Sequence, residues 1–316
     1  MNALLGAGAS LMEAAWEARR RLYARGVFKP RRVSARVVSI GNLTAGGTGK
    51  TTLTLHLAKL ARERGVEARV VCRRYRPGPL GYGDEERMYQ LALGESAVIA
   101  GQVKWRMAER AAREAALVLV DDGFSHWRLE RDVDLVLVDA SDPWGGGRML
   151  PAGRLREPRR ALQRAEAVVL TRLPEAPRHS NPDLIEEVRR AAPAARLAGA
   201  RHRVTGFRAL NGQPCPPPMR AHVVTATGNP QAVVESASSA TTVTGHSFYR
   251  DHHWFSAEDV ERERRLAASA GGRVLLTAKD VLRWPRDGGD ECVMDVSWEW
   301  VWGGEEVEQL VFPGAS

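Results

Sequence analysis

A glycine-rich segment at residues 41–51 contains the first residues whose types and spacing could do chemistry. It reads Gly-Asn-Leu-Thr-Ala-Gly-Gly-Thr-Gly-Lys-Thr. Backbone N–H groups at positions 46–49 can wrap phosphates, helped by the positive end of a following helix. The lysine would reach the β- and γ-phosphates, and the last threonine would ligate Mg²⁺. The segment predicts a nucleoside triphosphate site made by Thr44, Ala45, Gly46, Gly47, Thr48, Gly49, Lys50 and Thr51.

The residues around this segment have the pattern that a phosphate-binding loop requires. Residues 37–40 predict a short buried strand, and leucines after residue 50 recur at helical spacing. The strict motif has a glycine five residues before Gly49, where this chain has Thr44, and the doubled Gly46-Gly47 can supply the flexibility instead. An ordinary glycine-rich turn before a helix is the simpler alternative, but the order of strand, loop and helix favours a nucleotide site.

Two acidic segments follow further predicted strands. Gly-Asp-Glu-Glu at 83–86 follows a strand at 68–72, and Asp-Asp-Gly at 121–123 ends a strand at 117–120. Loops at the carboxyl ends of parallel strands face the ligand, so both segments are expected near the phosphates. Asp121 and Asp122 are placed where such enzymes hold Mg²⁺ or its water ligands. Helix capping is the alternative for Asp84, and a turn with capping roles is the alternative for the aspartate pair.

The order of the predicted elements indicates an α/β fold. Strands at 37–40, 68–72, 117–120, 133–138 and 167–170 alternate with helices, which implies a largely parallel sheet covered on both faces. Residues 174–200 are expected to form irregular or helical surface, and the proline cluster at 211–218 is the clearest linker. A second α/β segment follows from residue 221, with a helix capped at Ser256 and a strand or two within 291–312. We therefore expect an N-terminal helical segment at 1–33, a P-loop domain at 34–210 and a smaller C-terminal α/β domain at 219–316.

Composition limits the classes of protein and of partner. The chain has 316 residues, and its three cysteines are too far apart for a metal motif, which is typical of a reducing compartment. No run of about 18 apolar residues predicts a membrane span. The net charge of +8 favours anionic partners. No recognition motif or basic stripe with interleaved aromatic residues supports a nucleic-acid partner.

Much of the net positive charge lies in the first 36 residues. A helix is predicted at 3–25, with apolar residues close to one face and arginines in its C-terminal half. Trp16 and Tyr23 beside these arginines suit a membrane interface. Packing of the helix on the domain, with its arginines favoured by the helix dipole, is an equal alternative from the residues alone.

Seven motifs in the same order resemble those of the tetraacyldisaccharide 4'-kinases, the lipid A pathway kinases. They are residues 41–51 above, Gly-Asp-Glu (83–85), Asp-Asp-Gly-Phe-Ser-His (121–126), Leu-Pro-Ala-Gly-Arg-Leu-Arg-Glu-Pro (150–158), Gly-Asn-Pro (228–230), Asp-His (251–252) and Thr-Ala-Lys-Asp (277–280). The resemblance implies transfer of the ATP γ-phosphoryl group to the 4'-hydroxyl of a tetraacylated glucosamine disaccharide 1-phosphate. It also implies a peripheral enzyme at the cytoplasmic face of the inner membrane, whose N-terminal helix reaches the lipid on an anionic membrane surface.

The resemblance also assigns roles to residues. Asp84 and His252 would form the pair that deprotonates the sugar hydroxyl, and Lys50 would neutralise charge that develops on the phosphates. A histidine oriented by a carboxylate is a competent general base. Mg²⁺ would be organised by Thr51, Glu85 and Asp121. Asp122 and His126 would line the site, and Arg156 and Glu157 would contact substrate or phosphate.

Several positions depart from the family pattern and suggest a divergent member. Arg74 stands where the family usually has glycine, Glu86 where it has proline, Ser125 where it has glutamine and Arg154 where it has proline. The usual Asp-Arg after the third strand is replaced by Gln-Val-Lys-Trp-Arg at 102–106, and Tyr-Arg rather than Phe-Pro precedes Asp251. None of these changes removes a proposed catalytic group. A P-loop ATPase or GTPase that acts as a switch or chaperone for a protein partner is the alternative function.

Overall fold

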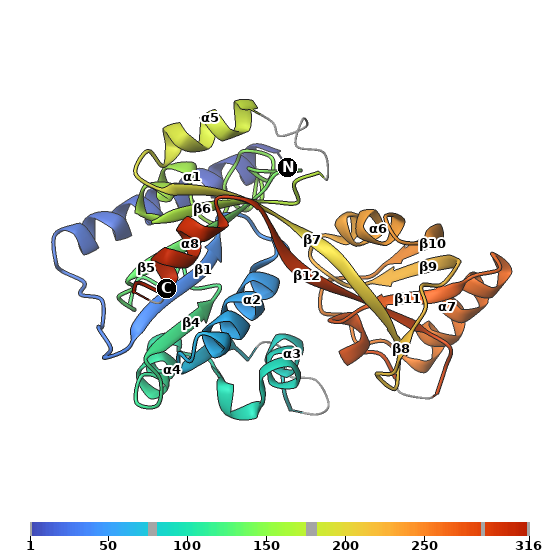
Figure 1. Ribbon diagram of the computed structural model, residues 1–316. Helices are drawn as coiled ribbons and strands as arrows, with labels where there is room; N and C mark the ends of the chain where they lie inside the picture. The colour runs from blue at the N-terminus through green and yellow to red at the C-terminus, as the bar shows by residue number, and fades with distance from the viewer. Residues whose placement is uncertain (1, 75–80, 175–181, 286–287, 315–316) are drawn as a thin grey trace. The chain divides into compact units, whose positions relative to one another are not determined.

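The computed structural model describes residues 2–74, 81–174, 182–285 and 288–314 (Figure 1). The chain divides into two compact units, each assembled from separate stretches of sequence. The first unit comprises Met1–Arg73, Leu93–Arg201 and Trp300–Ser316, and the second comprises Arg74–Ala92 and His202–Glu299. The long strands β7 (Arg196–Ala209) and β12 (Cys292–Trp302) each contribute residues to both units.

A parallel sheet forms the centre of the first unit. Its order is β7-β6-β5-β1-β4-β2-β3, with β1 (Arg36–Asn42), β2 (Ala68–Arg73), β3 (Val98–Gly101), β4 (Leu117–Asp121), β5 (Val133–Asp139) and β6 (Ala167–Thr171). Every residue of β4, β5 and β6 is buried. Their sequences are almost continuous apolar runs, as expected for strands covered on both faces.

Helices cover both faces of this sheet. On one face pack α1 (Asn2–Ala24), α4 (Lys104–Ala111), α5 (Pro182–Ala191) and the 3₁₀ helix η2 (Arg159–Arg164). The other face carries α2 (Lys50–Glu63), which buries Leu53 and Leu57, and α8 (Gly304–Val311) lies beside it. Glu308 of α8 accepts a hydrogen bond from Arg64 at the end of α2, at 2.8 Å. A short 3₁₀ helix, η1 (Glu95–Ala97), precedes β3. The α/β class predicted from the sequence is therefore confirmed.

The second unit contains a smaller sheet in the order β10-β9-β11-β12-β7. Its further strands are β9 (Arg220–Thr225), β10 (Thr242–Phe248) and β11 (Arg273–Thr277), which pair in parallel. Helix α7 (Ala257–Ser269) packs over one core and α6 (Pro230–Ser238) over another, while α3 (Asp84–Leu93) and the 3₁₀ helix η4 (Asp280–Leu282) complete the unit. The predicted capping box at the start of α7 is present, because Ser256 and Asp259 bond each other's backbone N–H groups.

The structure corrects three expectations about the later half of the chain. In 174–200, α5 agrees with the expected helical surface, but residues 198–200 are buried in β7, and 175–181 lies outside the described residues. The expected linker at 211–218 contains β8 (Pro214–Cys215), which forms an antiparallel hairpin with β7. Residues 291–312 form β12 and then α8, a helix that was not expected. Local composition gave the wrong prediction for these segments because pairing with neighbouring strands can stabilise a strand whose residues are typical of loops.

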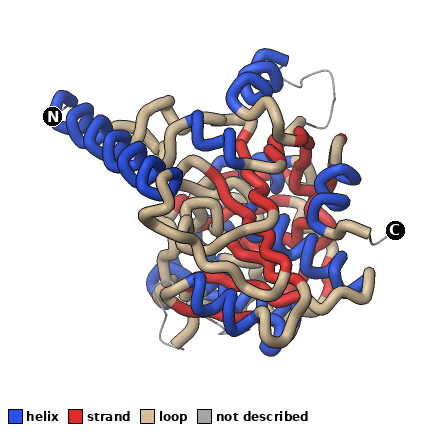
Figure 2. Tube along the Cα trace, turned by 90° about the vertical axis from the view of Figure 1, so that its left-hand side faces the viewer, coloured by secondary structure: helices blue, strands red, loops and turns tan. Residues whose placement is uncertain are grey.

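Helix α1 combines a packed face with an exposed one. Trp16 is only 8% exposed, and the Tyr23 ring packs against Trp127, so these two residues follow the alternative in which the helix packs on the domain. Leu4 and Leu11, at 79% and 72% exposed, lie on the other side of the helix. The N-terminal end of α1 projects from the body of its unit (Figure 2). No helix in the described part of the chain has the length and hydropathy needed to span a bilayer.

We predict that Gly199→Ala in β7 destabilises the first unit. An added Cβ would lie 2.4 Å from side-chain atoms of Leu173 and Trp302, closer than packed atoms approach. Overpacking of this kind costs about 1–3 kcal/mol, measurable as a lower midpoint of urea unfolding. Gly206→Ala in the same strand is the matched control, because nothing lies within 4 Å of its added Cβ. Equal midpoints for the two variants would contradict the prediction.

Candidate functional site

The predicted phosphate loop lies between β1 and α2, as the sequence indicated. Gly46 and Gly49 have φ angles of 125° and 93°, in the region that favours glycine. Among the described residues, none accepts a hydrogen bond from the backbone N–H groups of positions 46–49. The Thr48 hydroxyl is also buried without a partner among those residues. Unpaired donors at the start of a helix are suited to an anion, so the loop fits a polyphosphate.

Lys50, Asp122 and Arg156 come together around Asn42 beside this loop. The Lys50 ammonium donates to the Asn42 side-chain oxygen at 3.0 Å and lies 3.6 Å from the Asp122 carboxylate. Arg156 donates to both oxygens of that carboxylate, at 3.0 and 2.7 Å. Asn42 in turn donates to the Thr44 carbonyl at 2.8 Å. The structure therefore brings one predicted acid and two predicted cations together at the end of β1.

The Asp122 carboxyl is held ionised by these cations. Burial alone would raise the pKa of Asp122, but the charges of Lys50, Arg156 and Lys104 hold its pKa well below the usual range. Its backbone has a φ of 51°, an uncommon conformation for a residue with a side chain. Asp121, the preceding residue, ends β4 and is buried. The aspartate pair is thus placed at the carboxyl end of a central strand, as predicted.

Lys104 holds this segment, although its role was not predicted. The residue is only 3% exposed, and its ammonium donates to the carbonyl oxygens of both Asp121 and Asp122. It is the first residue of α4, where a positive charge opposes the helix dipole. That unfavourable position is the signal that could have identified it from the sequence. Lys104 stands within 102–106, where the chain departs from the family pattern.

His126 is placed in the same loop and is held neutral near pH 7. Burial is the main cause that lowers the pKa of His126 to about 4, and the positive charge of Lys104 lowers it further. A neutral imidazole there can line a phosphate site without adding charge.

Glu157 is buried and hydrogen-bonded to two other parts of the first unit. Its carboxylate is 3% exposed, and it accepts hydrogen bonds from the Trp16 indole at 2.8 Å and from Arg164 at 2.5 Å. These contacts attach α1 to the segment that carries Arg156. A contact between Glu157 and substrate stays a prediction, whereas its anchoring of α1 is seen directly.

Asp84 and His252 are brought together in the second unit, although 168 positions separate them in the chain. The imidazole Nδ1 lies 2.9 and 3.2 Å from the two carboxylate oxygens. An ionised carboxylate only accepts hydrogen bonds, so Nδ1 carries the proton and donates. In the neutral imidazole the lone pair is then on Nε2, which is the tautomer that a general base requires. His252 has a φ of 64°, so its backbone is held in an uncommon conformation.

Two cations that sequence analysis did not single out accompany Asp84. Arg283, which is buried, places a guanidinium nitrogen 3.3 Å from the Asp84 carboxylate, and the Lys279 ammonium lies 3.7 Å away. Burial alone would raise the pKa of Asp84, but the His252 hydrogen bond and the charges of Lys279 and Arg283 hold its pKa well below the usual range. Asp84 is therefore an ionised carboxylate that orients the imidazole. Lys279 belongs to the motif at 277–280, whereas nothing in the sequence marked Arg283.

Asp280 fixes Arg283 in turn. Its carboxylate accepts hydrogen bonds from Arg283 at 2.6 Å, from the Thr225 hydroxyl at 2.9 Å and from the backbone N–H of Ala226 at 3.0 Å. This fully buried acid is thus paired and hydrogen-bonded, as a buried charge must be. Lys279 also lies 3.4 Å from Glu85, so the acidic and basic motifs of the second unit form one network.

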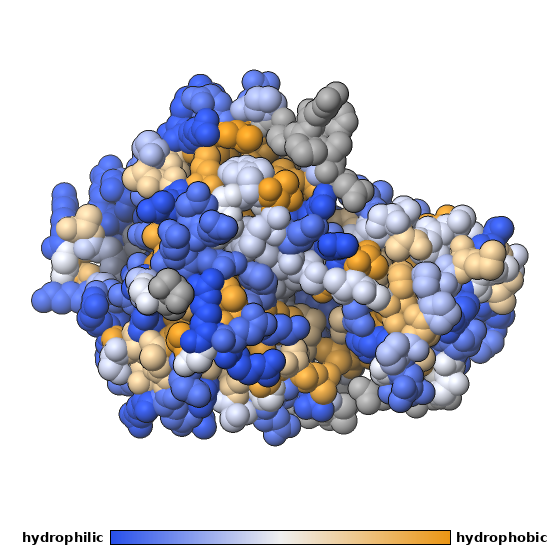
Figure 3. Space-filling view, in the orientation of Figure 1, coloured by the Kyte–Doolittle hydropathy of each residue, from blue (hydrophilic) through white to orange (hydrophobic). Residues whose placement is uncertain are grey.

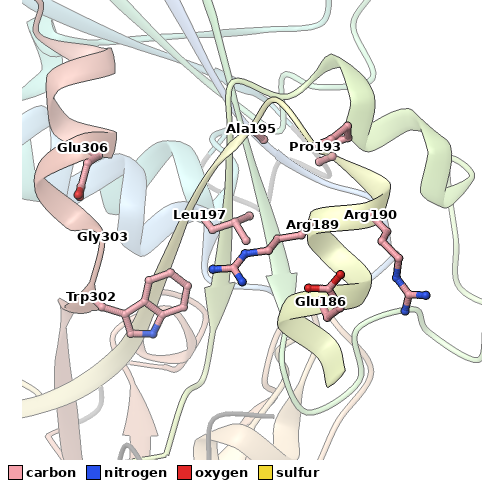
Figure 4. Close-up of a pocket in the computed structure, with 10 residues that line it drawn as sticks. Glu186, Arg189, Arg190, Pro193, Ala195, Leu197, Trp302, Gly303 and Glu306 are labelled. Carbon is pink, nitrogen blue, oxygen red and sulfur yellow. The ribbon is translucent and has the colours of Figure 1, made fainter. Parts of the chain in front are cut away.

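A separate cavity of about 710 Å³ lies in the first unit. Trp302 and Leu197 line one side, and the Arg189 side chain of α5 reaches toward the indole. In the space-filling view, hydrophobic side chains gather beneath α5 (Figure 3), and the close-up shows the lining residues (Figure 4). None of the predicted site residues is among the described residues that line this cavity.

Comparison with known proteins identifies the family. A family model described as Tetraacyldisaccharide-1-P 4'-kinase matches residues 1–310. The chain belongs to this family. Relatives named tetraacyldisaccharide 4'-kinase from Halothermothrix orenii and Syntrophobacter fumaroxidans are 33% and 36% identical over 85% and 82% of this chain and 79% and 74% of theirs. The structure of LpxK from Aquifex aeolicus in complex with ATP has a TM-score of 0.74 at 21% identity, covering 98% of both chains.

Membership in the tetraacyldisaccharide-1-P 4'-kinase family confirms the resemblance inferred from the seven motifs. It favours the kinase interpretation over a switch or chaperone ATPase. The likeness to the Aquifex aeolicus structure shows the shared fold. The individual site residues keep the roles predicted for them as proposals.

The residues expected to organise Mg²⁺ have suitable chemistry. Thr51 opens α2 and Asp121 ends β4 in the first unit, while Glu85 lies in α3 of the second unit. Hydroxyl and carboxylate oxygens are the ligands that Mg²⁺ prefers, usually together with substrate phosphates and water. The described residues contain no cluster of three or more His, Cys, Asp and Glu side chains that could hold a metal alone. The Thr51 hydroxyl and the Asp121 carboxylate of the first unit therefore fit a metal that arrives with a nucleotide.

We predict that Lys104→Met raises the pKa of His126 above about 4, because one of the positive charges that lower it is removed while burial remains. The pKa can be measured by NMR titration of the imidazole signals, assigned with His126→Asn. Lys59→Met, at an exposed position of α2, is the control and should leave the value unchanged. A His126 pKa that does not move in Lys104→Met would show that the lysine charge is not felt there.

Proposed function

We propose that the chain transfers the γ-phosphoryl group of ATP to the 4'-hydroxyl of a tetraacylated disaccharide 1-phosphate, a step of lipid A biosynthesis. The observation that carries the proposal is the Asp84–His252 pair, with the imidazole Nδ1 bound to the carboxylate at 2.9 Å. A nucleotide switch does not need a general base that deprotonates a substrate hydroxyl. The family to which the chain belongs and the open phosphate loop support the same activity.

In this proposal the second unit provides the general base. His252 Nε2 would accept the proton of the sugar hydroxyl as the oxygen attacks the γ-phosphorus. Asp84 would hold the imidazole in the required tautomer and stabilise the imidazolium that forms. Lys279 and Arg283 would keep Asp84 ionised, so that it orients the imidazole and does not take up the proton itself. The two cations would thus act on the reaction indirectly, by keeping the Asp84 carboxylate ionised.

The first unit would bind the nucleotide. Backbone N–H groups at 46–49 would hold the phosphates, and Lys50 would neutralise the charge that develops as the phosphoryl group leaves ADP. Nucleotide binding would exchange the contact of Lys50 with Asp122 for one with phosphate. Mg²⁺, when bound by Thr51, Asp121 and Glu85 with the phosphates, would supply further charge neutralisation. Asp122, His126 and Arg156 would line this site.

The lipid substrate implies that the enzyme works at an anionic membrane surface. We propose that α1 makes the contact, at the cytoplasmic face of the inner membrane, with its exposed leucines in the lipid and its arginines near phosphate headgroups. A cavity of about 520 Å³ supports this proposal, because residues of α1 and of the segment 147–160 line it together. Arg148, Arg159 and Arg160 are among its lining residues and suit an anionic lipid.

We predict that His252→Gln lowers kcat for phosphorylation of the disaccharide 1-phosphate about 10²–10⁴-fold, the usual contribution of a general base. The KM for ATP should stay unchanged, because the phosphate loop is intact. The measurement is transfer from labelled ATP with Mg²⁺ in detergent micelles. His253→Gln is the matched control: this neighbour bonds Asp259 at 2.8 Å and should keep nearly full activity. Wild type that hydrolyses ATP without making lipid product would refute the proposed function.

We predict that Leu4→Glu with Leu11→Glu weakens binding to vesicles that contain phosphatidylglycerol at least tenfold. Each exposed leucine that enters an apolar phase contributes about 1.5–3 kcal/mol, and the added charges would repel the anionic surface. Sedimentation with vesicles measures the effect. Leu266→Glu on α7, where the leucine is 44% exposed, is the control. If both variants sediment like wild type, α1 is not the membrane contact.

A further inference from the structure

Arg74 and Glu86, which the mechanism above does not use, form a bidentate ion pair close to Asp84. The guanidinium Nε and one terminal nitrogen of Arg74 donate to the two carboxylate oxygens of Glu86, at 2.9 and 2.6 Å. Glu86 is only 3% exposed. A buried carboxylate requires a partner, and the planar fork of arginine meets both oxygens at once. Both residues belong to the second unit, together with Asp84 and His252.

Glu86 also shapes the start of α3. The first helical hydrogen bond runs from the backbone N–H of Arg87 to the Gly83 carbonyl at 3.0 Å, which makes Gly83 the residue that caps the helix. Glu86 is then the third helical residue, and its carboxylate reaches back to the Gly83 N–H at 3.4 Å. This is the glutamate half of a capping box. Asp84 is the first residue of the helix, so it lies between the two groups that this contact joins.

We propose that the Arg74–Glu86 pair is a positioning device that fixes the first turn of α3 and thereby holds Asp84 in register with His252. The inference rests on the proposed function only in taking Asp84 and His252 as the base. Arg74 orients the Glu86 carboxylate, and this carboxylate fixes the conformation of the backbone at Gly83. The position of that backbone in turn determines where the Asp84 side chain lies. A misplacement of about 1 Å at such a site can lower a rate about 10²-fold.

A further observation supports a role for the pair in position rather than in charge. The cationic side chains of Arg283 and Lys279 lie 3.3 and 3.7 Å from the Asp84 carboxylate, whereas the Arg74 guanidinium binds the Glu86 carboxylate.

The test is a double-mutant cycle with Arg74→Met, Glu86→Gln and the double variant, in the full chain with the micelle assay. Each single change should lower kcat about tenfold and leave the KM for ATP within twofold of wild type. The double variant should be no slower than the slower single variant, because both changes remove one device. Arg74→Lys should recover part of the rate, since it keeps the charge but not the bidentate contact. Arg265→Met, which removes an exposed pair with Glu261, should have no effect.

A second readout does not depend on turnover. The Nδ1–H proton of His252, hydrogen-bonded to Asp84, should give a downfield proton resonance in the wild type, which His252→Gln removes. Loss or broadening of this resonance in Arg74→Met and Glu86→Gln supports the proposal even if the wild type does not phosphorylate the disaccharide. An unchanged resonance in both variants, or multiplicative losses of kcat in the double variant, would overturn the proposal. A lower melting temperature without these changes would indicate only a structural role for the pair, which would also contradict it.

Discussion

The chemistry proposed for the second unit depends on keeping one buried carboxylate, that of Asp84, ionised and fixed in place. Removing a carboxylate from water strongly favours its neutral form, so the protein must compensate with charge and hydrogen bonds. Lys279 and Arg283 supply the charge, His252 supplies the hydrogen bond, and Asp280 prevents Arg283 from turning away. Without these groups, a protonated Asp84 could no longer select the imidazole tautomer that leaves Nε2 basic.

In the first unit, positive rather than negative groups must be held in place. Its loop presents N–H groups that have no acceptor among the described residues, and Lys50, Lys104 and Arg156 lie near the Asp121–Asp122 segment beside it, so the region carries positive charge. Asp122 balances part of this charge, and a neutral His126 avoids adding to it. A site of this kind attracts polyphosphates while its own cations stay ordered. In the proposed function, nucleotide binding would exchange the contact of Lys50 with Asp122 for a contact with phosphate.

Sequence reasoning predicted the parts of the molecule that local chemistry determines. Glycines before Lys50, apolar runs such as β4 and the box at Ser256 each depend on neighbours a few residues away, and all appear as expected. What it missed depends on distant contacts. The start of β7 reads as surface until its neighbours in the sheet cover it, and α8 becomes identifiable only where it packs beside α2. Lys104 and Arg283 are unremarkable by type, because their importance comes from carbonyl and carboxylate oxygens far away in the chain. Trp16 could not be assigned from the sequence for the same reason, because its indole also suits a lipid interface and its hydrogen-bond partner, the buried Glu157, is far away in the chain.

The way in which the chain passes between the two units has a consequence for the order of folding. The chain leaves the first unit at residue 74, returns at 93, leaves again at 202 and comes back only at 300. The contacts of α8 with α2, and of Trp302 with Gly199, therefore cannot form until every residue of the second unit has been synthesised. Contacts between residues so far apart in the chain form slowly, because the long segment between them loses conformational entropy before the contacts stabilise the fold. During synthesis the nucleotide loop thus exists for some time on an incomplete first unit, exposed to proteases and to premature ligands.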